Sequence, residues 1–215
     1  MPSQSRNDFR KKLLPDVTAL IDSHRMLNPN GRGRRRLGHI TRSGVLMLCA
    51  AWEIYNEDVL IECIEFIVKH ECNAHNLPDR VKGKICQAAK KDKHEFGVLR
   101  LSGNGWKAVY RKEAVRQCEA LNTPKFGNIS SLFHDWLGIE ESKLEDAWRH
   151  SKLELNEFVT LRGEIAHRGG DAKYVPISEL KSLKEKIDDL IVDTDRMLCL
   201  YTRDLIGKQP WRNTS

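Results

Sequence analysis

The spacing of apolar residues along the chain predicts helices. Between residues 43 and 71, apolar side chains recur every three or four positions, which places them on one face of a helix. They are Val45, Leu48, Trp52, Tyr55, Val59, Cys63 and Phe66. The same spacing predicts further helices over about 7–26, 78–91, 105–121, 129–136, 142–168 and 178–206. We therefore expect an all-α fold, an antiparallel helical bundle with extra short helices and loops.

Turn-forming residues and helix caps refine this layout. Ser142 and Glu145 fit a capping box at the start of the helix 142–168, whose inward stripe includes Ala147, Leu153, Phe158, Leu161 and Ile165. Gly169 and Gly170 should end that helix, and Ser178 should cap the last helix, 178–206. We expect residues 1–215 to form a single domain with a variable insert at about 78–137.

Basic residues gather in two places. The loop 28–38 is rich in glycine and arginine, and a second run of lysines lies near Lys90, beside Trp106 and Tyr110. Each cluster is either solvated surface or a surface that binds RNA phosphates, with the two aromatic residues available for base stacking. The candidate RNA-binding residues are Arg32, Arg34, Arg35, Arg36, Lys90, Lys91 and Lys93.

Composition limits the function classes. The 215 residues carry a net charge of +6, which is compatible with a polyanionic partner but does not require one. Six cysteines without a Cys-x-x-Cys pair are typical of reduced thiols, and the longest apolar run, 45–52, is too short to cross a membrane. We expect a cytoplasmic protein that does not bind membranes. The segment His70–His75 lacks the spacing of a zinc site, so we expect no metal and no cofactor.

Arg162 and His167 are the residues best suited to chemistry. A histidine titrates near neutrality and can both accept and donate a proton, whereas an arginine presents a planar, permanently charged fork to phosphate oxygens. Five residues correspond to about 140° around a helix, so the two side chains do not stack on each other. Both should lie at the edge of the inward stripe, where helices or subunits meet. The alternative is a surface arginine and a histidine that caps the helix C-terminus.

Two segments resemble the HEPN superfamily. Leu161-Arg-Gly-Glu-Ile-Ala-His-Arg-Gly169 is similar to its Arg-x4–6-His motif. The segment 42–57, with Ala51-Trp-Glu53, resembles the first core helix of the RiboL-PSP or MAE-type branch. The resemblance implies a helical bundle that dimerises, so that Arg162 and His167 of two protomers line one cleft.

Active members of this superfamily are metal-independent endoribonucleases, often toxins or antiviral defence effectors. The resemblance implies that His167 acts in acid–base chemistry as the ribose 2′-OH attacks the adjacent phosphate, and that Arg162 stabilises charge on that phosphate. The products would be a 2′,3′-cyclic phosphate and a 5′-hydroxyl. An antitoxin or regulatory partner is also implied. The motif arginine is often followed by a polar residue, but Gly163 stands here, which leaves a non-catalytic module for assembly, RNA binding or nucleotide binding as the alternative.

Glu53 is a candidate supporting residue on independent grounds. It follows eight apolar or small residues, so its carboxylate should be partly buried and in need of a partner. Arg162 or His167 on a facing helix would serve, and Arg42 is the structural alternative. Glu57 lies one turn later on the same side and is a second supporting candidate.

Overall fold

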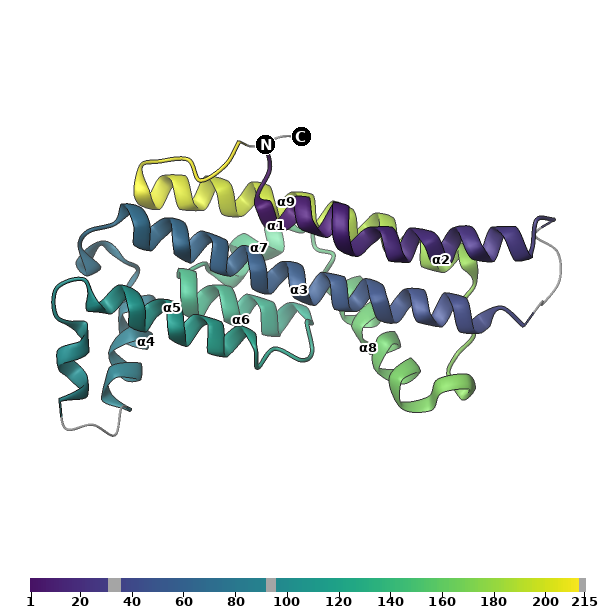
Figure 1. Cartoon of the computed structure of the whole chain (residues 1–215), viewed down its shortest axis with the longest axis horizontal. Helices are drawn as coiled ribbons and strands as arrows, with labels where there is room; N and C mark the ends of the chain where they lie inside the picture. Colours follow the sequence, from purple (N-terminus) through teal and green to yellow (C-terminus); the bar gives the residue numbers. More distant parts are fainter. Residues whose placement is uncertain (31–35, 92–95, 213–215) are drawn as a thin grey trace.

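The long helix α3, Gly38–His70, forms the axis of the molecule (Figure 1). The computed structural model describes residues 1–30, 36–91 and 96–212. Helices before and after α3 in the sequence pack along it, because α3 buries side chains over almost its whole length, from Ile40 to Ile67. The described residues form helices and no strands, so the expected all-α bundle is confirmed.

The chain enters the bundle through a nearly continuous helical stretch along α3. It consists of α1, Gln4–Asp8, a π-helical turn, Phe9–Leu13, and α2, Leu14–Leu27. Pro15 has no N–H to donate to the preceding turn, and the π turn lies where that hydrogen bond is missing. The predicted helix 7–26 is therefore real, but it begins earlier and contains a local change of helix type.

Residues 74–137 form a cluster of shorter helices beside the second half of α3. After a 3₁₀ turn, Ala74–Asn76, they are α4, Asp79–Lys90, a 3₁₀ turn, Gly97–Leu101, α5, Gly105–Cys118, and α6, Phe126–Leu137. Trp106 is only 4% exposed and Tyr110 is fully buried, with its hydroxyl donating to the carbonyl of Trp136. The predicted role of these two aromatic residues in base stacking is therefore wrong: they belong to the core.

The predicted helix 142–168 is two helices. α7, Glu141–Ala147, ends at Trp148, and α8, Lys152–Arg168, begins after Arg149 and His150, which both have positive φ. Trp148 is buried against Trp52 of α3, with ring centroids 5.4 Å apart, so the chain turns to keep that contact.

The predicted caps are also corrected. Glu140 rather than Ser142 precedes α7, and Pro176 rather than Ser178 precedes the last helix, neither with a side-chain cap. Leu153 is 69% exposed and is not part of the inward stripe of α8. The predicted stop at Gly169 is correct, because Gly169 has φ +52 and a 3₁₀ turn, Gly169–Asp171, follows.

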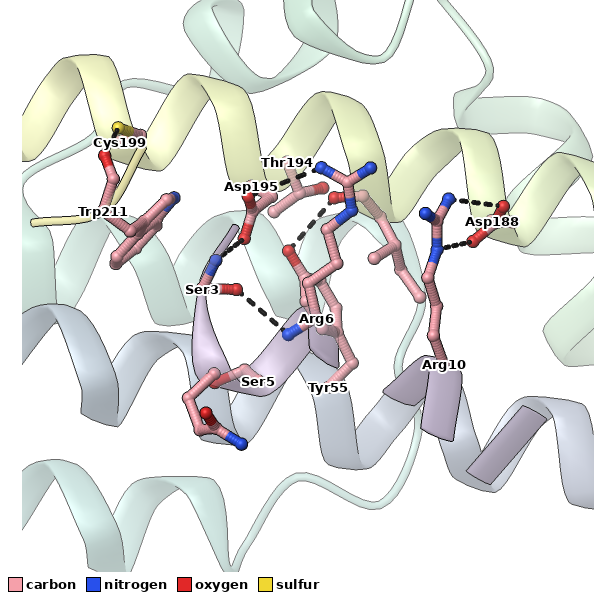
Figure 2. Close-up of polar contacts among 12 residues, drawn as sticks. Ser3, Ser5, Arg6, Arg10, Tyr55, Asp188, Thr194, Asp195, Cys199 and Trp211 are labelled. Carbon is pink, nitrogen blue, oxygen red and sulfur yellow. Dashed lines mark hydrogen bonds and ion pairs between the residues drawn. The ribbon is translucent and has the colours of Figure 1, made fainter. Parts of the chain in front are cut away.

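The last helix, α9, Ile177–Ile206, returns along α3 and is attached to the N-terminus by buried polar contacts (Figure 2). Asp195 of α9 is fully buried, accepts a hydrogen bond from the backbone N–H of Ser3 at 3.3 Å, and faces Arg6 at 3.8 Å. Tyr55 of α3 donates its hydroxyl to the carbonyl of Ile191 at 3.1 Å. These contacts hold α1, α3 and α9 in one arrangement.

The cysteines and the hydropathy of the helices can be compared with the predictions from composition. All six cysteines are free, and Cys49, Cys63, Cys118 and Cys199 lie in the core. Among the described residues, no helix is both long enough and apolar enough to cross a membrane.

Candidate active site

Arg162 lies on the face of α8 that packs toward α3. Buried side chains on both sides of it in sequence, Phe158 and Ile165, mark this face, and Arg162 itself is half-buried. α8 passes α3 in the opposite direction: Trp148, just before α8, touches Trp52, and Tyr174, just after it, lies beside Gly38 at the start of α3. A half-buried arginine between buried Phe158 and Ile165 is compatible with the predicted position at the edge of the inward stripe.

The charge of Arg162 acts on one turn of α3. Burial raises the pKa of the Glu53 carboxyl, and the positive charge of Arg162 opposes that rise. Burial likewise raises the pKa of the Cys49 thiol to about 12, and the positive charge of Arg162 again opposes the rise. Cys49 and Glu53 are four residues apart and therefore neighbours on one face of α3. Arg162 consequently faces this turn of α3.

Glu53 and Arg162 are close but not directly bonded. Among the described residues, Glu53 forms no ion pair within 4.0 Å, and its buried Oε2 accepts no hydrogen bond. A buried carboxylate oxygen without a donor is costly. The expected partnership of Glu53 with Arg162 is thus present as charge proximity only, and the alternative partner, Arg42, makes no ion pair with Glu53 either.

Glu57 belongs to a different environment. Burial, together with the negative charges of Glu53, Asp58 and Glu119, raises its pKa to about 7. Glu119 directly follows α5, and the thiol of Cys118 lies 3.9 Å from the backbone carbonyl of Glu57. Glu57 therefore lies near the end of α5, in a cluster of acids.

His167 lies in the last turn of α8 and is exposed. In the part of the chain that the structure describes, its imidazole makes no hydrogen bond or ion pair. Within one chain His167 is exposed whereas Arg162 is half-buried, so His167 is open to a substrate or to a second subunit.

Gly163 occupies the flank of α8 between these two residues. A Cβ built on it would meet nothing within 4 Å. Packing within the chain therefore does not require glycine at this position. Glycine also means that the residue after Arg162 has no polar side chain that could assist the site.

The other predicted residues lie elsewhere. Lys90 and Lys91 are exposed at the end of α4, at the opposite end of the molecule from α8 (Figure 1). Arg36 is exposed where α3 begins and has φ +55. The remaining candidates lie outside the described residues: Arg32, Arg34, Arg35 and Lys93.

A second group of cations was not predicted from the sequence. His24 of α2, Arg42 of α3 and Lys181 of α9 line one cavity together with Arg36. These residues are distant in sequence and form no motif, so only the packing of three helix ends brings them together.

Comparison with known proteins identifies the family. A family model described as RiboL-PSP-HEPN matches residues 8–200, most of the chain. No curated protein and no solved structure matches. The chain belongs to the RiboL-PSP-HEPN family, and the match covers α3, α7 and α8 together with most of α9.

Proposed function

We propose that this member of the RiboL-PSP-HEPN family is a metal-independent endoribonuclease whose site forms from Arg162 and His167 of two protomers. The observation that carries the proposal is the placement of the two residues on α8: Arg162 is held over the Cys49–Glu53 turn of α3, and His167 is exposed at the helix end. An arginine fixed by a rigid helix and an accessible histidine are the groups that in-line attack by a 2′-OH needs.

In this mechanism His167 moves a proton to or from the reacting oxygens as the ribose 2′-oxygen forms a bond to the adjacent phosphorus. The bond from phosphorus to the 5′-oxygen breaks, which leaves a 2′,3′-cyclic phosphate and a 5′-hydroxyl. Arg162 binds the phosphate oxygens that gain charge in the transition state. Glu53 is a positioning residue, because its negative charge beside Arg162 favours one orientation of the guanidinium.

A dimer completes the site in this proposal. The spacing along α8 predicts that the two residues of one chain point apart, so a substrate phosphate would meet Arg162 of one protomer and His167 of the other. Next to Glu53, α3 exposes Met47 and Ile54, each 39% exposed and seven residues apart on one face of the helix. An exposed apolar stripe beside the site is suited to contact between subunits. We further propose a role as a toxin or defence effector, held in check by an antitoxin or another regulator.

The experiment is cleavage of labelled RNA in EDTA by wild type, Arg162→Ala and His167→Ala. We expect both variants to lose cleavage, and the wild-type products to end in a 2′,3′-cyclic phosphate. Arg168→Ala, an exposed cation next to His167, is the matched control and should cleave normally. RNA that wild type binds but leaves intact would instead support a non-catalytic RNA-binding module, an alternative that Gly163 favours.

A mixing experiment tests the composite site. Arg162→Ala and His167→Ala are each inactive alone, but a heterodimer of the two has one intact arginine and one intact histidine on different chains. If the site joins two protomers, the mixture regains part of the wild-type activity. A mixture that exchanges subunits and stays inactive would place the working pair within one chain.

A further inference from the structure

A cavity of about 580 Å³ lies at the end of the bundle where α2 ends and α3 and α9 begin (Figure 1). Its basic lining comes from all three helices and from the residues before α3. The basic residues are His24, Arg25, Arg36, His39, Arg42 and Lys181. None of the described residues that line it is an aspartate or a glutamate. The volume falls in the range of small-molecule sites.

The positive charge of this cavity is largely uncompensated. Arg25 has an acidic partner, Asp22 of its own helix, at 3.6 Å. In the part of the chain that the structure describes, no carboxylate lies within 4.0 Å of the charged nitrogens of Arg36, Arg42 or Lys181. Three unpaired cations around one concave surface concentrate positive potential and attract an anion.

The cavity also contains polar groups that lack partners. His24 is only 9% exposed, and its imidazole makes no hydrogen bond among the described residues. Oδ1 of Asn28, another lining residue, is buried and accepts no hydrogen bond. Buried polar atoms are normally satisfied, so Oδ1 of Asn28 indicates a ligand with a hydrogen-bond donor, and the cations around the cavity indicate that the ligand also has an anionic group. A nucleotide of RNA has both, in its phosphate and its 2′-hydroxyl.

An aromatic wall completes the cavity. Tyr174 is 46% exposed, and its ring lies 3.7 Å from the position that a Cβ on Gly38 would take. The guanidinium of Arg42 lies 3.0 Å from the same position, so the aromatic ring and the cation are adjacent. A base can stack on such a ring while its phosphate meets the cation.

The cavity is on the same side of α3 as Arg162. Arg42, Cys49 and Glu53 are spaced by seven and four residues, so they share one face of the helix. The rise of a helix puts Arg42 about 10 to 17 Å from the turn that Arg162 faces. α8 runs from Arg162 toward the cavity and leads into Tyr174. One RNA strand can therefore reach both places.

We propose that this cavity binds a backbone phosphate, with its nucleoside, of the RNA strand that is cleaved at Arg162 and His167. The identity of the ligand as RNA rests on the proposed function. Arg42, Arg36 and Lys181 bind the phosphate, Tyr174 stacks on the base, and Asn28 accepts from the ribose hydroxyl. The cavity thereby holds the strand a fixed distance from the cleaved bond.

The test measures binding of a fluorescent single-stranded RNA with natural 2′-hydroxyls at several salt concentrations, with every protein in the His167→Ala background so that the strand stays intact. Lys181→Gln and Arg42→Gln should each weaken binding about tenfold at low salt. Each should also reduce the slope of log K against log salt by about 0.7, the value for one lost phosphate contact on a single strand. Lys181 is exposed, so its variant tests the cavity without disturbing the core. Lys112→Gln, an exposed lysine of α5 near the far end of α3, is the charge-matched control and should bind like wild type.

The outcomes separate this inference from the proposed function. If wild type cleaves unmodified RNA while the cavity variants bind and cleave like wild type, the cavity proposal is overturned and the nuclease proposal stands. If the cavity variants lose RNA binding but wild type never cleaves, the cavity proposal stands and the nuclease proposal falls. Equal weakening by Lys112→Gln would assign the effect to net charge and overturn the cavity proposal. Binding of AMP at Arg42 and Lys181 by a protein that does not bind RNA would overturn it as well.

Discussion

Gly163→Ala is the substitution that tests most directly whether the flank of α8 is open. A glycine inside a helix costs about 0.5–1 kcal/mol relative to alanine, because it loses more backbone freedom on folding. The new Cβ would meet nothing within 4 Å, so no clash offsets this gain. We expect Gly163→Ala to raise the free energy of unfolding by about 0.5–1 kcal/mol and Tm by about 1–4 °C.

Gly83→Ala is the matched control for this measurement. Gly83 lies inside α4, is exposed, and also has nothing within 4 Å of its Cβ position. Urea unfolding followed by tryptophan fluorescence gives the free energy for both variants, and thermal melts give Tm. Both should be stabilised to a similar degree, and both should cleave RNA like wild type.

A Gly163→Ala protein less stable than wild type, beside a stabilised Gly83→Ala, would refute the reasoning. The Cβ would then meet an atom absent from the isolated chain, and repeating the melts across protein concentrations shows whether a second subunit supplies that atom. Normal stability with lost cleavage would instead mean that the RNA approaches the backbone of Gly163 closely.

Three other substitutions follow from the packing and the charges. Gly44→Ala puts a Cβ 2.5 Å from Cδ2 of the buried Leu180, so we expect a loss of about 1–3 kcal/mol in urea unfolding, partly relieved by adding Leu180→Ala. Asp195→Ala leaves Arg6 buried without its carboxylate and should cost about 3–5 kcal/mol, and a loss under about 1 kcal/mol would contradict a stabilising pair. The folded-state pKa of Glu57, raised to about 7 by burial, exceeds its ordinary value of 4.5, so the folded protein retains a proton that the unfolded chain releases. Stability should therefore fall as pH rises from about 4.5 to 7, and Glu57→Gln should flatten that decline in unfolding curves measured at pH 5 and pH 8.

Apolar spacing predicted most helices, because a helix that buries one face must repeat its apolar residues every three or four positions. The same rule failed between Ala147 and Lys152. There the buried contact of Trp148 with Trp52 ends one helix and starts another, and this tertiary contact leaves no periodic signal. Apolar spacing also predicts that Leu153 lies in the core, whereas the turn between α7 and α8 places it on the surface.

The candidate site was predictable in part. The partial burial of Glu53 followed from its apolar neighbours, whereas the prediction from spacing that Arg162 and His167 do not form a close pair stays a prediction. The sequence left open whether Arg162 or His167 faces Glu53, because the answer depends on how α8 crosses α3; the charge that acts on Glu53 is that of Arg162. The acids around Glu57 were missed because Glu119 comes from α5, far away in the sequence.

The buried oxygen of Glu53 bears on the proposed dimer. A carboxylate oxygen without a donor is unfavourable in the isolated chain, and the nearby Arg162 does not satisfy it directly. This free-energy cost is removed if a second protomer, or the hydroxyl of a bound ribose, donates a hydrogen bond to the Glu53 oxygen when the site assembles. Such a site is incomplete as a monomer and complete on assembly, so subunit concentration would control a nuclease that could harm its own cell. Glu53→Gln distinguishes this account from a purely structural role: the amide can itself donate, so the monomer should become no less stable, while the Arg162-dependent cleavage rate falls and its pH profile shifts.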